Sequence, residues 1–296
     1  MSEHCLSTAQ ALSQAKQILT NSGSDSPQLD SEILLLKVLN DVPNSTQKTP
    51  YNKTWLMTWP EKCLTQTQAK QFFHYVNLRT TGKPIAYITG YKDFWTLCLH
   101  VTSATLIPRP ETEQLVECAL EKIAPEARQN ILDLGTGSGA IALAIASERP
   151  LAQILATDMS ASALTVAQQN AIASQLSNVC FKQADWFHGI GSQVFDVIVS
   201  NPPYISQDDP YLEEHVRQYE PLSALHAKHN GLADIQTIIT TSRAHIKDNG
   251  WLLFEHGHRQ SEAVQSLFSH YGFSQISTIN DLNHVPRVTM AQLKRK

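Results

Sequence analysis

The sequence predicts an α/β protein in which an open, mostly parallel sheet carries helices on both faces and follows a small all-helical domain. From about residue 130 to the end of the chain, strand-like and helix-like stretches alternate, which is typical of such a sheet. A glycine-rich turn at residues 135–139 joins the first of these strands to a helix. Before residue 83, in contrast, apolar residues recur mainly at helical spacing.

The composition is that of a folded protein in a reducing compartment. Of the 296 residues, 42% are hydrophobic, and a chain of this length suggests two domains. The formal net charge of -4 provides no general attraction to nucleic acid. The five cysteines are scattered, so we expect neither a disulfide framework nor a zinc site and we expect a cytoplasmic location. We find no secretory signal and no apolar stretch that could span a membrane.

Residues 1–82 are predicted to form the helical domain. Apolar residues follow helical spacing from Ala11 to Leu19 and from Ile33 to Leu39, and a further helix is predicted near Gln66 to Arg79. No catalytic cluster lies in this part of the chain. We therefore expect it either to recognise a partner or to have a packing role alone.

Residues 83–107 are predicted to be a linker with a β-hairpin, because residues 92–101 alternate in polarity and are rich in aromatic side chains. The larger domain is expected to span residues 108–296. The roles of Arg109, Glu111 and Glu113 at its start stay open. Proline followed by glutamate is typical of a helix start, whereas Arg109 is a candidate either for contact with a protein substrate or for bracing the hairpin.

The larger domain is predicted to alternate strands and helices. The strands are expected at residues 131–134, 153–157, 179–182, 194–200, 251–255, 273–279 and 285–293, and the helices at 140–148, 160–173, 232–246 and 260–271, with a long loop before residue 232. Ligands in this architecture bind at the carboxyl ends of the strands.

A nucleotide-containing cofactor is indicated by the first strand and the turn that follows it. Glycines let the backbone approach a ligand closely, and the helix N-terminus supplies free N–H groups. The loop comprises Gly135, Thr136, Gly137, Ser138 and Gly139, and it fits a dinucleotide as well as a methyl donor. Asp158, at the end of the next strand, is placed to accept both ribose hydroxyls, or else to cap the next helix.

The next two strands favour the methyl donor. Asp185 and Trp186 follow the third strand, where a carboxylate can accept the adenine amino group and an aromatic ring can lie beside the base. The fourth strand ends in Asn201-Pro202-Pro203-Tyr204. Prolines have no backbone N–H, so this segment offers acceptors for a planar NH₂ group together with the ring of Tyr204. A simple Pro-Pro turn is the alternative. We therefore expect S-adenosylmethionine as cofactor and methylation of an amide or an aromatic amine.

The chain resembles, over nearly all its length, the peptide chain release factor glutamine N5-methyltransferases. The segments that carry the resemblance are Gly82 to Gly90, Phe94-Trp95, Ile107 to Glu113, Asp133 to Gly139, Asn201 to Ile205, Tyr219 to Pro221, Glu255 to Gly257 and Arg287 to Thr289. Lys83 and the stretch from Asp281 to Pro286 depart from the pattern of this family. Both departures lie outside the proposed catalytic residues.

This resemblance implies a Rossmann-like class I methyltransferase sheet and S-adenosylmethionine binding by the loop 135–139, Asp158, Trp186 and Asn201. The substrate glutamine, in the Gly-Gly-Gln loop of class I release factors, would be held by Asn201, Pro202, Pro203 and Tyr204. Among these, Asn201, Pro202 and Tyr204 are the expected catalytic residues. The helical N-terminal domain would help to recognise the release factor.

Other functions stay open at this point. A sister family methylates a glutamine of a ribosomal protein, but it typically has serine at the position of Pro110. A nucleic-acid amino methyltransferase would share the tetrapeptide, although the net charge is unfavourable for it. A non-catalytic cofactor-binding module is a third alternative. A metal site at His256 and His258 is not expected, because no third ligand is evident.

Overall fold

The structure is a computed structural model that describes residues 5–41, 50–206, 214–281 and 283–295. The chain divides into two compact units, Met1–Gly90 and Tyr91–Lys296. Each unit has a buried hydrophobic core of its own.

The first unit is all-helical, as the sequence predicts. Its helices are α1 (Thr8–Asn21), α2 (Pro27–Asp41), α3 (Lys53–Thr58), α4 (Gln66–Thr80) and α5 (Ile85–Thr89). Capping boxes begin α1 and α4, where Ser7 and Thr65 each accept a hydrogen bond from the backbone N–H three residues on. The core of the unit includes the fully buried side chains of Leu34 and Phe72.

A disulfide joins Cys5 and Cys63 in this unit. Their Cα atoms lie 5.7 Å apart, and the N–H of Leu64 donates to the carbonyl of Leu6 at 2.9 Å, so the two segments run side by side. No disulfide framework was expected from the sequence, and this single pair was not predicted. The pairing depends on how α1 and α4 pack, which the spacing of cysteines along the chain does not reveal.

The second unit begins with the predicted hairpin. Strands β1 (Tyr91–Phe94) and β2 (Leu97–His100) pair antiparallel. At their turn Trp95 has a left-handed backbone, and its N–H donates to Oε1 of Glu113 at 2.8 Å. Glu113 is the first residue of the helix α6 (Glu113–Lys122), so its carboxylate ties the hairpin turn to that helix.

A seven-stranded sheet forms the centre of the second unit, in the order β5-β4-β3-β6-β7-β9-β8. Five neighbouring strands are parallel, and β9 is antiparallel to both of its neighbours. This confirms the predicted α/β fold with a mostly parallel sheet. The strands are β3 (Asn130–Leu134), β4 (Gln153–Asp158), β5 (Val179–Gln183), β6 (Phe195–Ser200), β7 (Ile246–Glu255), β8 (Ser274–Asn280) and β9 (Pro286–Gln292).

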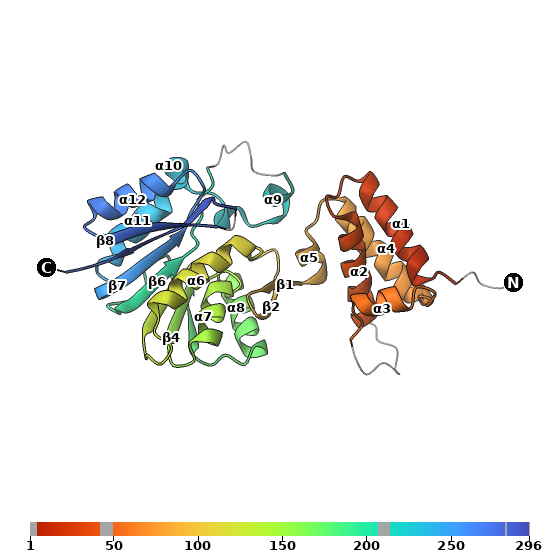
Figure 1. Ribbon diagram of the computed structural model, residues 1–296, viewed down its shortest axis with the longest axis horizontal. Helices are drawn as coiled ribbons and strands as arrows, with labels where there is room; N and C mark the ends of the chain where they lie inside the picture. The colour runs from red at the N-terminus through yellow and green to blue at the C-terminus, as the bar shows by residue number, and fades with distance from the viewer. Residues whose placement is uncertain (1–4, 42–49, 207–213, 282, 296) are drawn as a thin grey trace. The chain divides into compact units, whose positions relative to one another are not determined.

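Helices cover both faces of the sheet (Figure 1). On one face lie α6 (Glu113–Lys122), α7 (Ala140–Glu148) and α8 (Ala161–Ala173), and on the other lie α11 (Ala233–Ser242) and α12 (Ser261–His270). Shorter helical turns are η1 (Pro110–Thr112), α9 (Glu214–Tyr219), η2 (Leu222–Ala224) and α10 (Lys228–Gly231).

Two expected boundaries were wrong. The stretch before residue 232, expected to be a loop, contains α9, η2 and α10. The helix expected over 232–246 ends at Ser242, because Ile246 already pairs with Phe195 of β6. The register of β7 then shifts before Trp251. Because of this irregularity, the residues of β7 before Trp251 do not follow the regular alternation by which a strand is predicted.

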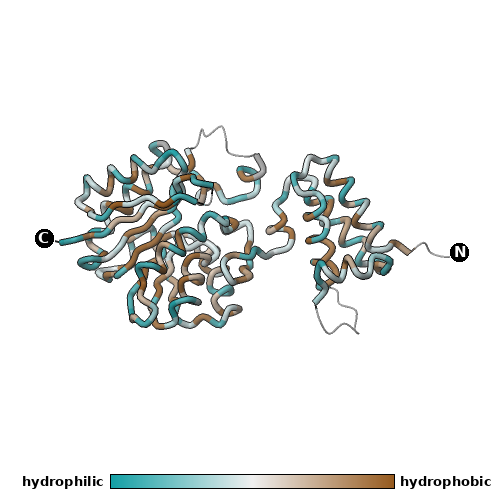
Figure 2. The backbone as a smooth tube through the Cα atoms, in the orientation of Figure 1, coloured by the Kyte–Doolittle hydropathy of each residue, from teal (hydrophilic) through white to brown (hydrophobic). Residues whose placement is uncertain are grey.

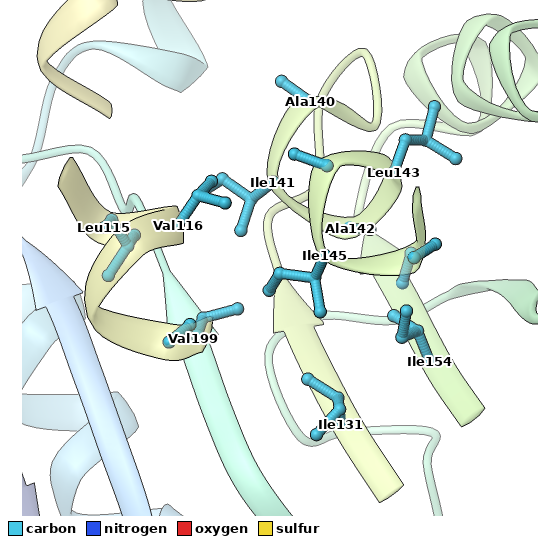
Figure 3. Close-up of a cluster of buried hydrophobic side chains, with 14 of the residues drawn as sticks. Leu115, Val116, Ile131, Ala140, Ile141, Ala142, Leu143, Ile145, Ile154 and Val199 are labelled. Carbon is cyan, nitrogen blue, oxygen red and sulfur yellow. The ribbon is translucent and has the colours of Figure 1, made fainter. Parts of the chain in front are cut away.

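The sheet is buried on both faces, and the hydropathy of the chain follows this arrangement: hydrophobic segments run along the central strands (Figure 2). Helix α7 is apolar on all sides, and its residues Ala140–Ala146 are buried, as expected for a helix enclosed by its neighbours. In Figure 3, Ile141 of α7 lies next to Val116 of α6, and Ile145 lies above Ile131 of β3. This packing holds the start of α7, and with it the glycine loop, at the end of β3.

Candidate active site

A cavity of ≈ 270 Å³ opens at the carboxyl ends of β3, β4, β5 and β6. Its wall includes several residues that the sequence predicts for the site, namely Gly135, Gly137, Asp158, Asp185, Trp186, Asn201 and Pro203. All belong to the second unit. The end of a parallel sheet therefore brings four separate segments together around one space.

The glycine loop contributes its backbone to this wall. Gly135 and Gly137 have φ of +73° and +57°, and Gly139, at +87°, precedes α7 and packs against Leu143. The N–H groups of Gly135 and Thr136 both donate to the carbonyl of Thr157 on β4. The loop is thereby fixed in a conformation that favours glycine.

The two hydroxyl residues of the loop do not line the cavity. Thr136 is buried and donates to Oδ2 of Asp133 at 2.6 Å. Ser138 is also buried, and its carbonyl accepts from Nδ2 of Asn170 at 2.9 Å. These two residues therefore stabilise the loop and do not contact the cavity.

Asp158 joins the loop to β4. Its Oδ2 accepts from the N–H of Gly137 and its Oδ1 from the N–H of Ser160, both at 2.9 Å. The cap of α8 is the Ser160 hydroxyl, which accepts from the N–H of Ala163, so Asp158 is not the capping residue. Burial raises the pKa of Asp158 and outweighs these backbone hydrogen bonds.

Asp133 has a more extreme environment. It is fully buried, and burial raises its pKa to about 7. Its Oδ1 accepts no hydrogen bond of regular geometry among the residues that the structure describes. Asp133 is not among the residues that line the cavity. Asp133 belongs to the motif from Asp133 to Gly139, but no role was predicted for it.

Asp185 and Trp186 form another side of the cavity. The Trp186 backbone is left-handed, at φ of 47°, in the turn closed by the hydrogen bond from His188 N–H to the Asp185 carbonyl. Its ring lies beside Gly135, because a Cβ at that glycine would be 3.6 Å from the ring. A planar group in the cavity thus has an aromatic neighbour.

The tetrapeptide divides between the cavity wall and the interior. Asn201 and Pro203 line the cavity, whereas Pro202 is buried and Tyr204 is not part of the wall. Nδ2 of Asn201 donates to Oγ1 of Thr112 at 3.2 Å. The Tyr204 hydroxyl donates to Oε1 of Glu255 at 3.0 Å, and burial, followed by this carboxylate, raises the pKa of Tyr204.

The remaining wall comes from residues for which no role in the site was predicted. They contribute Ala104, Thr105, Leu106, Met159, Ser160, Ser162, Ala163, Ala184, Pro221, Ser223 and Ala224. The signal that could have found part of this wall is the Tyr219-Glu220-Pro221 motif, which immediately precedes η2.

Arg109 braces this part of the wall. Its guanidinium pairs with Oε1 of Glu220 at 2.5 Å, and Oε2 of Glu220 accepts from the N–H of Ile107 at 3.2 Å. The Glu220 carboxylate, nearly excluded from solvent, thus connects the segment that ends at Ile107 to the segment that begins at Pro221. This ion pair gives Arg109 a partner outside the hairpin, and contact of Arg109 with a protein substrate stays a prediction.

His256 has partners for both ring nitrogens, the carbonyl of Gly257 at 3.0 Å and the hydroxyl of Thr289 at 2.7 Å. Within the described ranges no group of three or more His, Cys, Asp or Glu side chains is arranged to hold a metal ion. Nor does any helix in that part of the chain have the length and apolar character needed to cross a membrane.

Comparison with known proteins gives a consistent result. Residues 10–90 match the family model "PrmC N-terminal domain" and residues 111–217 match "Methyltransferase small domain". The chain is 44% identical over 288 residues to a release factor glutamine methyltransferase of Aliivibrio fischeri, covering 97% of this chain and 98% of that protein. It is also 44% identical to the release factor glutamine methyltransferase of Escherichia coli K12, covering 91% and 93%.

Among solved structures, a methyltransferase from Pyrococcus furiosus has a similar fold. The TM-score is 0.52 at 15% identity, with 75% of this chain and 98% of that chain covered. This likeness supports the class I methyltransferase fold.

Proposed function

Because this chain belongs to the release factor glutamine methyltransferases, we propose that it methylates the side-chain nitrogen, N5, of the glutamine in the Gly-Gly-Gln motif of class I peptide chain release factors. The chain is an enzyme with a methyltransferase fold. Its proposed methyl donor is S-adenosylmethionine, and its proposed place of action is the cytoplasm.

The residues around the cavity fit this donor. Asp158 is suited to the ribose, Asp185 and Trp186 to the adenine, and the glycine loop to close backbone approach. Asp133 belongs to the same motif but is fully buried and does not line the cavity. When bound, the donor supplies a methyl group on a positively charged sulfur.

The single observation that carries the proposal is that Asn201 and Pro203 line the same cavity as Gly135 and Asp158. A segment with carbonyl acceptors and no proline N–H thus borders the space suited to the donor. A glutamine amide in this space could donate its two hydrogens to Oδ1 of Asn201 and the carbonyl of Pro202.

These acceptors would assist the reaction electrostatically. An amide nitrogen shares its lone pair with the carbonyl and is therefore a poor nucleophile. Positive charge develops on the nitrogen as it attacks the methyl group. Two acceptors stabilise that charge where it forms, and a fixed position supplies the alignment. Tyr204, held at its hydroxyl by Glu255, is proposed to contact the plane of the substrate amide. No strong base is needed before the attack, because the nitrogen would become acidic only as the methyl–sulfur bond breaks and the methyl–nitrogen bond forms, and it would then release one proton to solvent.

We further propose that the helical first unit, including the predicted domain 1–82, contributes to recognition of the release factor. Its own family model sets it apart from the methyltransferase domain, which supports a separate task. The predicted linker 83–107 would connect it to the predicted domain 108–296.

The test is transfer of one methyl group to a purified release factor, read by peptide mass spectrometry, for the wild type and for Asn201→Ala. We expect the methyl on the Gly-Gly-Gln glutamine and a rate lower by roughly 10²–10³ in the variant, as for loss of one such hydrogen-bonding group. Near-normal turnover by Asn201→Ala would contradict the mechanism. A methyl found only on a ribosomal protein or on RNA would contradict the substrate.

A further inference from the structure

The amide of Asn201 has two possible orientations, and the proposed reaction requires one of them. Its oxygen must face the substrate, because its NH₂ group cannot accept an N–H. Nothing in the tetrapeptide itself selects this orientation, since an amide presents similar shapes when its oxygen and nitrogen are exchanged. The neighbours of Asn201 therefore decide whether the site can work.

Thr112 is the neighbour that contacts this amide. It lies in η1, 89 residues before Asn201, and its Oγ1 accepts from Nδ2 of Asn201 at 3.2 Å. The Thr112 side chain is almost fully buried, with 4% of the residue exposed. A hydroxyl has one proton, so whether it donates to or accepts from Asn201 depends on where that proton is directed.

Glu255 is the acceptor toward which the hydroxyl proton of Thr112 is directed. It is the last residue of β7, it is 1% exposed, and its Oε1 accepts from the Tyr204 hydroxyl at 3.0 Å. Its Oε2 is buried and accepts no hydrogen bond of regular geometry among the described residues, so the carboxylate keeps unused acceptor capacity. Burial raises the pKa of Glu255, and the hydroxyls of Thr112 and Tyr204 act against that effect by stabilising its charged form.

A carboxylate is a stronger acceptor than an amide oxygen, because hydrogen bonds to charged groups are roughly twice as strong. The Thr112 proton therefore turns toward Glu255, and its lone pairs turn toward Asn201. Only the NH₂ side of Asn201 can then face Thr112, which leaves Oδ1 for the cavity.

We propose that Thr112 is a positioning residue that, with its proton directed to Glu255, fixes the Asn201 amide with its oxygen toward the substrate. Glu255 thereby serves both ends of the tetrapeptide, since it also holds the Tyr204 hydroxyl. This proposal rests on the proposed function and deepens it.

The test compares Thr112→Val, which removes the hydroxyl at nearly constant volume, with Thr112→Ser, which keeps it. We expect Thr112→Val to lower kcat about 10-fold, as for loss of one hydrogen bond, and Thr112→Ser to stay within about 2-fold of the wild type. The dissociation constant of S-adenosylmethionine, measured by calorimetry, should be unchanged in both variants. Equal kcat in Thr112→Val and the wild type would overturn the proposal, as would an equal loss in both variants.

A double-mutant cycle separates positioning from general packing. If Thr112 acts through Asn201, then Thr112→Val should change the residual rate of Asn201→Ala by no more than about 2-fold. A further 10-fold loss in that background would overturn the proposal. If instead Asn201→Ala itself keeps normal turnover, the proposed function's mechanism fails, and the two failures are thus distinguishable.

A readout without turnover completes the test. In protein labelled with ¹⁵N at asparagine, the side-chain NH₂ protons of Asn201 should exchange with solvent slowly in the wild type and in Thr112→Ser, and faster in Thr112→Val. The same exchange rate in all three proteins would contradict an orientation held by Thr112.

Discussion

The buried carboxylate of Asp133 makes the stability of the folded protein depend on pH. Its pKa in the folded protein is about 7, against an ordinary value of 3.8, because burial disfavours the charged form. A pKa raised by folding contributes stability at low pH, and this contribution is lost as the pH rises toward the folded pKa. Ionised Asp133 is thus a source of instability in the protein without ligand.

We therefore predict that Asp133→Asn is more stable than the wild type at pH 8 and that this advantage shrinks toward pH 4. Between these values the wild type should lose about 4 kcal/mol of unfolding free energy through this group, and the variant none of it. Denaturant unfolding of both proteins at several pH values measures the difference. A stability difference that does not change with pH would show that Asp133 keeps an ordinary pKa.

The residues that could be predicted from the sequence are those that directly follow a strand. Asp158, Trp186 and Asn201 reach one cavity because the carboxyl ends of parallel strands meet at one edge of the sheet. Thr112 and Glu220 could not be predicted in the same way. Their contacts join residues 89 and 111 positions apart, through loops whose path no local pattern specifies.

At the scale of elements, the end of α10 sets the position of the tetrapeptide. Gly231 has φ of +81°, and a Cβ there would collide with the Tyr204 carbonyl oxygen and lie 2.5 Å from Nε2 of Gln260. The same Nε2 donates to the Tyr204 carbonyl at 3.0 Å, and Oε1 of Gln260 accepts from the N–H of Gly257. The tetrapeptide is therefore confined between α10 and the start of α12.

We predict that Gly231→Ala lowers the methylation rate about 100-fold by displacing Tyr204, with little change in affinity for the donor. Gly23→Ala is the matched control. Gly23 also has φ of +81° but would meet nothing within 4 Å, so its variant should lose about 1–2 kcal/mol of stability and keep its rate. Equal rates for the two variants would mean that the close approach to Tyr204 is without consequence.

Element boundaries were predicted well where glycine or proline marks them, as for α7, which lies between Gly139 and Pro150 and spans Ala140–Glu148 as expected. They were predicted poorly for β7, whose early residues lie outside the regular register. The helical turns between Glu214 and Gly231 are too short to show a period at all.

At the scale of the whole molecule, two units with separate cores share one chain. The disulfide between Cys5 and Cys63 belongs to the first unit only and closes a loop of 58 residues. Such a cross-link restricts the unfolded chain, and a loop of this length corresponds to about 4 kcal/mol.

We predict that a reductant lowers the melting temperature of the first unit in the wild type but not in Cys5→Ser, while donor binding by the second unit is unaffected. Calorimetric scans with and without reductant, together with donor titrations, measure both effects. Loss of donor binding on reduction would contradict the independence of the two cores. An unchanged melting temperature in the wild type would contradict stabilisation by the disulfide.

The two prolines after Asn201 also affect the release of the methylated product. Residues 202 and 203 carry no backbone N–H, so at this edge the backbone receives hydrogens and gives none. An unmodified glutamine brings two hydrogens to two acceptors, but its methylated form has only one left, and a methyl group where the other had been. We therefore expect the methylated release factor to bind more weakly than the unmodified one and to dissociate after a single methyl transfer. A second methylation is prevented because the methylated amide can no longer donate hydrogens to both acceptors.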